Sequence, residues 1–136
     1  MLQKLHLVMV PSTDHDRSIA FYESLGLEKR VDFPFGGNGR WVELFPPDGV
    51  AGIALITATP DLVGINTGMI LPVADVEAVR AGLERRGADV DPAVARKGSP
   101  VEITMGAVTL AEPEPPMFWL RDPDGNALLI IQGLDG

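Results

Sequence analysis

The stretch that decides the fold runs from Val8-Met-Val-Pro-Ser-Thr-Asp14 into Phe21-Tyr-Glu-Ser-Leu-Gly26. The chain repeats it 61 residues later, without a gap, as Met69-Ile-Leu-Pro-Val-Ala-Asp75 and Gly82-Leu-Glu-Arg-Arg-Gly87. Each copy has an apolar strand, a Pro, an Asp that can cap a helix, an apolar helical face and a Gly that ends the helix. The repeat predicts two supersecondary units that bury their apolar faces on each other.

Three antiparallel strands are predicted after each helix. The first copy has a strand before its helix at residues 5–10, and strands after it at 27–33, 40–45 and 52–57. The turn Pro46-Pro-Asp-Gly49 matches Asp122-Pro-Asp-Gly125 in the second copy. We therefore expect an α+β fold with two βαβββ modules, at about residues 4–57 and 67–132, in one domain that covers residues 1–136.

The second copy carries about fifteen extra residues between its helix and its last hairpin. This insertion falls within residues 88–116, where five prolines interrupt any long element. Two interpretations stay open for it: a rim or lid over a cleft between the modules, or a disordered loop.

Composition limits the class of partner. The formal charge of the 136 residues is −8, which disfavours nucleic acid and anionic membranes and favours cationic ligands. There is no cysteine, so disulfides, thiolate metal sites and cysteine nucleophiles are excluded. No apolar run is long enough for a membrane helix, and the N-terminus lacks a signal-peptide pattern. A cytoplasmic protein is expected.

Besides the two modules, the chain has the segment Gly-Gly-Asn-Gly-Arg-Trp41 and the closing Arg121-Asp-Pro-Asp-Gly-Asn126. With these features it resembles the vicinal oxygen chelate superfamily over roughly residues 4–132. This superfamily contains glyoxalases, extradiol dioxygenases, fosfomycin-resistance enzymes and bleomycin-binding proteins. The resemblance implies a curved mixed sheet around a cleft and a homodimer. It does not fix the chemistry, because the superfamily includes lyases, isomerases, dioxygenases and proteins that only bind.

The resemblance also implies where metal ligands would stand, at four strand positions that face the cleft. In this sequence those positions are Leu7, Gly68, Leu129 and, by alignment with the second copy, Leu55. None offers a donor atom, so we expect no metal and no cofactor. Of the two histidines, we interpret His6 as a strand-end residue rather than a ligand, and His15 as a solvated residue of the first helical turn.

Strand alternation predicts the lining of the cleft. Val42 and Leu44 should face the helix, which leaves Trp41, Glu43 and Phe45 on the open side. The equivalent strand of the second module gives its open side Met117, Trp119 and Arg121. The predicted substrate-binding set is Leu7, Met9, Trp41, Glu43, Phe45, Leu55, Ile70, Trp119 and Leu129.

Such a lining suits a planar or cationic small organic ligand. The aromatic residues could equally be core, and Glu43 could be either an acid without a partner or the structural partner of Arg40. Three functions follow. The leading one is a metal-free small-molecule binder of the drug-binding or resistance type. The alternatives are a metal-dependent lyase, isomerase or dioxygenase, and a regulatory subunit that binds nothing.

Overall fold

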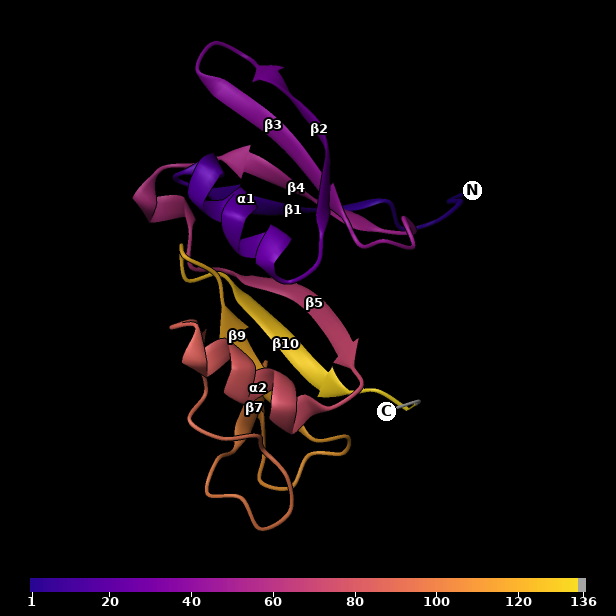
Figure 1. The fold of residues 1–136 in the computed structure, drawn as a ribbon, viewed down its shortest axis with the longest axis vertical. Helices are drawn as coiled ribbons and strands as arrows, with labels where there is room; N and C mark the ends of the chain where they lie inside the picture. The colour runs from indigo at the N-terminus through magenta and orange to yellow at the C-terminus, as the bar shows by residue number, and fades with distance from the viewer. Residues whose placement is uncertain (135–136) are drawn as a thin grey trace. The chain divides into compact units, whose positions relative to one another are not determined.

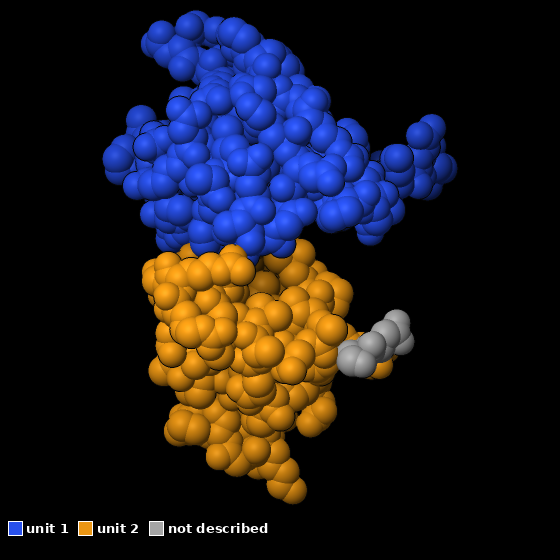
Figure 2. Space-filling model, in the orientation of Figure 1, with its two compact units in different colours: residues 1–67, 122–126 blue, residues 68–121, 127–136 orange. Residues whose placement is uncertain are grey.

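The computed structural model describes residues 1–134, and these form two compact units (Figure 2). Unit 1 comprises residues 1–67 and the turn 122–126, and unit 2 comprises residues 68–121 and 127–134. Each unit contains one helix packed on one four-stranded sheet. The predicted α+β class is therefore confirmed. No helix within residues 1–134 is both long enough and apolar enough to cross a membrane.

In unit 1 the sheet has the strand order β1-β4-β3-β2, with β1 parallel to β4 and the other pairs antiparallel. The elements, labelled in Figure 1, are β1 (Leu7–Ser12), α1 (His15–Ser24), β2 (Glu28–Phe35), β3 (Gly39–Phe45) and β4 (Gly52–Thr57), followed by the short 3-10 helix η1 (Pro60–Leu62).

Helix α1 begins where the sequence predicts. The side chain of Asp14 accepts a hydrogen bond from the amide of Arg17, and the chain leaves the helix through Gly26 at a φ of +102°. Ser18, Ile19 and Tyr22 form the buried side of α1, and the hydroxyls of Ser18 and Ser12 hydrogen bond at 2.6 Å. The helix covers the sheet face made by Val10, Val42, Leu44, Ile53 and Leu55.

Unit 2 repeats this order as β5-β10-β9-β6. Its elements are β5 (Asn66–Val73), α2 (Val76–Arg85), β6 (Asp89–Val90), β9 (Met117–Arg121) and β10 (Ala127–Gln132) (Figure 1). Asp75 caps α2 by accepting from the amide of Ala78, as Asp14 caps α1. The helix packs on the sheet through Val76 and Leu83.

The insertion of the second copy is ordered. It forms a hairpin of β7 (Ile103–Met105) and β8 (Val108–Leu110), and Ala95 pairs with Met117 as an isolated bridge. Ala95 and Ile103 are fully buried and form one apolar cluster with Met117 and Leu129. The insertion therefore covers one face of the sheet of its own unit. The interpretation as a disordered loop is wrong, and the cleft between modules stays a prediction.

Two strands of unit 1 run past a proline and end later than predicted. Strand β1 was expected to stop at Val10, but it continues through Pro11, and β2 extends through Pro34 to Phe35. Both are edge strands, so one side of each already lacks a ladder partner and a missing amide hydrogen can be tolerated there. The extension of β2 matters for function because it adds Phe35 to the sheet.

Candidate functional site

The face of the unit 1 sheet that points away from α1 is the candidate site. In the strand register Met9 lies beside Ala54, and Ala54 lies beside Glu43. Neighbouring residues in register place their side chains on the same face of a sheet. This open face therefore carries Leu7 and Met9 from β1 and Trp41 and Glu43 from β3, as predicted.

The prediction for Leu55 is wrong. Leu55 pairs with Val42 and Val10, lies on the α1 side of the sheet and is fully buried. The turn before β4 spans residues 46–51, one residue more than the matching turn 122–126, so the assumed alignment was shifted by one position. A shift of one residue turns a strand side chain to the opposite face. Ala54 occupies the open-face position in place of Leu55.

The open face carries two aromatic residues that the sequence analysis missed. Phe33 pairs with Trp41 in the register, and the rings of Phe35 and Trp41 lie 5.2 Å apart with an interplanar angle of 39°. Phe33 is 44% exposed and Phe35 is 54% exposed. Val31, Phe33 and Phe35 alternate with Asp32 and Pro34, so a period of two in the sequence was the signal that could have revealed them. We call Phe33, Phe35 and Trp41 the aromatic platform.

Glu43 is the acidic group next to the aromatic platform. The indole Nε1 of Trp41 donates a hydrogen bond to Glu43 Oε2 at 2.8 Å. Arg40 does not pair with Glu43. Its side chain lies on the α1 side of the sheet, where it donates to Asp32 at 2.9 and 2.8 Å and to Asp16 at 2.8 Å. Neither alternative for Glu43 describes the structure, because Glu43 has a partner and that partner is the Trp41 indole rather than the Arg40 guanidinium.

Phe45 lies on the predicted face but is not available to a ligand. It is only 7% exposed, because the Arg30 guanidinium lies 5.3 Å from its ring centroid and the His6 ring lies 5.7 Å away. Gly52 makes room for the ring, since a Cβ at that position would stand 2.7 Å from a Phe45 carbon. His6 precedes β1 and contacts Phe45. Phe45 is thus part of the core at the edge of the candidate site.

The predicted residues of unit 2 have a different environment. Leu129 pairs with Trp119 on the face opposite α2, but Leu129 is 2% exposed and the half-buried Trp119 packs against the cluster formed with the insertion. Ile70 on β5 is 59% exposed. For Trp119 the core interpretation therefore describes the structure better than the ligand-platform interpretation.

The positions that would hold a metal do not fit one. With the register corrected, they are Leu7, Ala54, Gly68 and Leu129, which have no oxygen, nitrogen or sulfur donor in their side chains. Within residues 1–134 no three His, Asp or Glu side chains gather in a way that could bind an ion. A Lewis-acid step at these positions has no protein ligands to support it.

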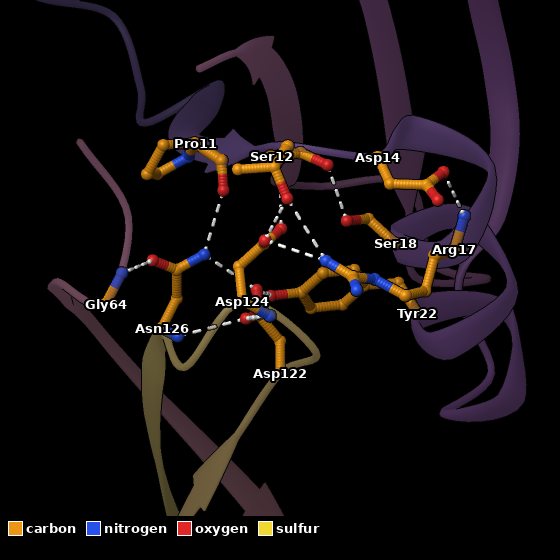
Figure 3. Close-up of polar contacts among 11 residues, drawn as sticks. Pro11, Ser12, Asp14, Arg17, Ser18, Tyr22, Gly64, Asp122, Asp124 and Asn126 are labelled. Atoms are coloured by element: carbon orange, nitrogen blue, oxygen red, sulfur yellow. Dashed lines mark hydrogen bonds and ion pairs between the residues drawn. The ribbon is translucent and has the colours of Figure 1, made fainter. Parts of the chain in front are cut away.

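A buried polar network holds the turn 122–126 in unit 1 (Figure 3). The Tyr22 hydroxyl donates to Asp122 Oδ2 at 2.7 Å, and Asn126 Nδ2 donates to Asp122 Oδ2 and to the Pro11 carbonyl, each at 2.9 Å. Asn126 Oδ1 accepts from the amide of Gly64 at 2.9 Å. Burial, and then the charge of Asp122, raises the pKa of Tyr22 far above its usual value. The network satisfies its own donors and acceptors, so the role of this turn is structural.

His15 differs from its predicted environment. It is buried at the start of α1, and its Nε2 lies 3.2 Å from the carbonyl oxygen of Leu55. The first residue of this helix points at the sheet because Asp14 fixes the entry of the chain, so a position that looks solvated in the sequence becomes part of the core. His15 therefore does not contribute to the open face.

Comparisons with known structures agree with the described fold. An antibiotic-binding protein, TnmS3, from a Streptomyces species is 26% identical, covers 96% of both chains and gives a TM-score of 0.69. A superfamily member from Sphaerobacter thermophilus is 23% identical over 97% of this chain and 98% of that one, with a TM-score of 0.73. The bleomycin resistance determinant encoded on transposon Tn5 is 22% identical over 97% and 99%, with a TM-score of 0.60.

None of the curated proteins matches the chain. The sequence profile of one superfamily, however, matches residues 4–130, which is nearly the whole chain. The strand order of both units and the structural neighbours agree with this match. The chain belongs to the Glyoxalase/Bleomycin resistance protein/Dioxygenase superfamily.

Proposed function

We propose that this protein binds a small organic molecule on the open face of the unit 1 sheet, without a bound metal. The observation that carries the proposal is the aromatic platform, in which Phe33 and Phe35 remain about half exposed beside Trp41. Exposed aromatic rings on a sheet offer apolar contact area to a ligand at a low entropic cost. Next to the platform, Glu43 adds one acceptor, because its carboxylate is hydrogen-bonded to Trp41. Farther along the same face, on β1, the exposed Met9 adds an adaptable apolar side chain.

Two further facts support binding rather than metal-dependent catalysis. The positions where a metal would be held carry Leu, Ala and Gly, so the lyase, isomerase or dioxygenase alternative lacks its ligand set. One structural neighbour above 25% identity, TnmS3, is an antibiotic-binding protein. We infer that this chain sequesters a drug-like ligand in the same general way.

We also propose that the protein forms a homodimer that completes the binding site. Ile70 is 59% exposed on an edge strand of the unit 2 sheet, and Leu62 and Ile65 are exposed in the segment between the modules. Such exposed apolar side chains favour self-association. Sedimentation at micromolar concentration should give twice the 14.5 kDa chain mass, and a monomer at all concentrations would contradict the proposal.

The binding proposal is tested by calorimetric titration with acridine, a planar neutral molecule, and with bleomycin. Phe35→Ala should weaken the binding of acridine by roughly 1–3 kcal/mol because stacking area is lost. Phe21→Ala is the matched control, since it removes the same side chain from helix α1. Equal affinities of wild type and Phe35→Ala would contradict the site, and a stoichiometric transition metal in the purified protein would favour the enzyme alternative.

A further inference from the structure

Glu43 differs from the other acidic residues of the unit 1 sheet. Asp32 is ion-paired with Arg40 and Lys29, and Glu28 is ion-paired with Arg30. Within residues 1–134 no Lys, Arg or His forms an ion pair with Glu43. The platform therefore has a carboxylate beside it whose charge the protein does not neutralise.

The Trp41 indole determines how this carboxylate is presented. Its Nε1 donates to Oε2 at 2.8 Å, while Oε1 accepts no hydrogen bond from the described residues. One oxygen is therefore fixed by the platform itself, and the other is free to accept from a ligand. A carboxylate oriented in this way pairs best with a cationic nitrogen that carries a hydrogen, because charge and hydrogen bond then act together.

The surroundings strengthen the preference for a cation. Unit 1 contains five Lys and Arg residues. All but Lys4 are ion-paired with acids other than Glu43, namely Arg17, Lys29, Arg30 and Arg40. The chain as a whole carries a formal charge of −8. The faces of Trp41, Phe33 and Phe35 also attract positive charge through their π electrons.

We propose that the ligand of this site is an aromatic cation with a protonated nitrogen, which stacks on the aromatic platform and donates a hydrogen bond to Glu43. This inference rests on the proposed function, because it names the chemical class of the molecule bound at the same site. Glu43 is the specificity-determining residue, and Trp41 has two roles, as a stacking surface and as the donor that positions the carboxylate.

Three probes with the same tricyclic ring separate these roles at mildly alkaline pH. Acridine is neutral, 10-methylacridinium is a cation without an N–H donor, and 9-aminoacridine is a cation with N–H donors. We expect wild type to bind 9-aminoacridine most tightly and acridine least tightly, with a difference of about tenfold or more for a charge-assisted hydrogen bond. Added salt should weaken the binding of both cations and leave acridine unchanged.

The decisive variant is Glu43→Gln, which keeps the side-chain shape and an acceptor for Trp41 but removes the charge. Its affinity for 9-aminoacridine should fall about tenfold, while its affinity for acridine should stay within about twofold of wild type. Glu23→Gln is the matched control, because it removes an exposed charge from α1, and it should leave all three affinities unchanged. Trp41→Phe keeps a ring without the N–H and should reduce the preference for 9-aminoacridine over acridine.

The outcomes distinguish this inference from the function on which it rests. If wild type binds acridine as tightly as 9-aminoacridine, or if Glu43→Gln weakens both equally, the platform binds planar molecules but Glu43 does not select cations, and the inference fails alone. If none of the three probes binds, the inference is wrong, and if bleomycin does not bind either, the proposed function is wrong as well. Far-UV circular dichroism and thermal unfolding of each variant confirm that the fold is intact.

Discussion

The sheet of unit 1 leaves Met9, Phe33 and Phe35 exposed on the face away from α1, whereas the corresponding face of unit 2 buries Met117 and Leu129 under the insertion. Both sheets have the same strand order, and both helices are capped by an Asp. The difference therefore does not arise from the strands or the helix. It arises because only the second unit has a segment long enough to fold over its own sheet.

The two hairpins that follow the helices also differ in how they are held. The β2–β3 hairpin is fixed on its α1 side by Arg40, Asp32 and Lys29, while the β7–β8 hairpin is held by Ile103 in an apolar cluster. Burial of a large aliphatic side chain contributes more to stability than an ion pair that water can reach. We therefore expect the covered face to be the more stable part and the open face to be the part that adapts to a ligand.

The largest predicted effect concerns the covered face. Leu129→Ala should lower the free energy of unfolding by about 2–5 kcal/mol, because it removes a buried side chain and leaves a cavity. Met9→Ala on the open face should change it by no more than about 0.5 kcal/mol. Urea denaturation of both variants measures the contrast.

A double-mutant cycle sharpens the same prediction. Ile103→Ala alone should be destabilising, and its effect should not add to that of Leu129→Ala, because the two side chains share one cluster. If Leu129→Ala and Met9→Ala lower the free energy of unfolding equally, or if the effects in the cycle add, either result would contradict the packing of the insertion on the unit 2 sheet.

The next effect concerns the polar network of unit 1. Tyr22→Phe removes the donor to the buried carboxylate of Asp122 and should cost about 1–3 kcal/mol of unfolding free energy. Tyr22 is the only tyrosine in the chain, so ultraviolet absorbance reports its ionisation directly. Because the pKa of Tyr22 is raised in the folded state, its phenol should ionise only when the protein unfolds.

The pH dependence of stability tests this prediction in a second way. A phenol whose pKa is raised on folding contributes stability that is complete below its unfolded pKa of about 10 and declines as the pH rises above that value. Tyr22→Phe should abolish this part of the alkaline decline. A phenolate signal near pH 10 in protein that is still folded would contradict the assigned burial and hydrogen bond.

The smallest effect concerns the ion pairs of the β2–β3 hairpin. Hydrogen bonds from Arg40 and then from Lys29 lower the pKa of Asp32, so the stability they add is present above the unfolded pKa of about 4 and is lost as the pH falls below it. Asp32→Asn should cost about 0.2–1 kcal/mol at neutral pH and nothing once the carboxyl is protonated.

Hydrogen exchange of the hairpin amides locates this last effect. Asp32→Asn and high salt should each speed exchange in residues 28–45 and leave residues 103–110 unchanged, because the second hairpin is held by apolar contacts. Glu23→Gln serves as the control for loss of a negative charge. Faster exchange in both hairpins would contradict the view that ion pairs stabilise the β2–β3 hairpin and apolar contacts stabilise the β7–β8 hairpin.

Predictions from the sequence were most accurate for features that depend only on residues close together along the chain. Asp14 and Asp75 cap the helices as expected, Val42 and Leu44 face α1, and residues 52–57 form the predicted strand. Capping and alternation depend only on neighbours along the chain, and each copy provides the same signals. The positions of Trp41 and Glu43 on the open face followed from the same alternation.

The errors occurred where distant segments meet. Nothing in the sequence near Leu55 indicates that the turn before it is one residue longer than its counterpart, yet that residue moves Leu55 from the open face to the core. The burial of His15 against the Leu55 carbonyl, and of Phe45 beneath Arg30, likewise depends on contacts between elements. Strand β2 continues past the predicted end at Phe33, because Pro34 lies at the edge of the sheet, where a missing amide hydrogen is tolerated.

By itself the sequence determined the α+β class, the order of one helix and its strands in each copy, the apolar residues at the expected metal positions and the placement of Trp41 and Glu43 on one face of β3. Only the tertiary structure decided which sheet face is free. Local periodicity specifies the two faces of a strand, but whether a face is covered depends on which other segment packs on it. In unit 2 that segment is the insertion. In unit 1 the described residues leave Phe33, Phe35 and Trp41 accessible, and we propose that the ligand binds there.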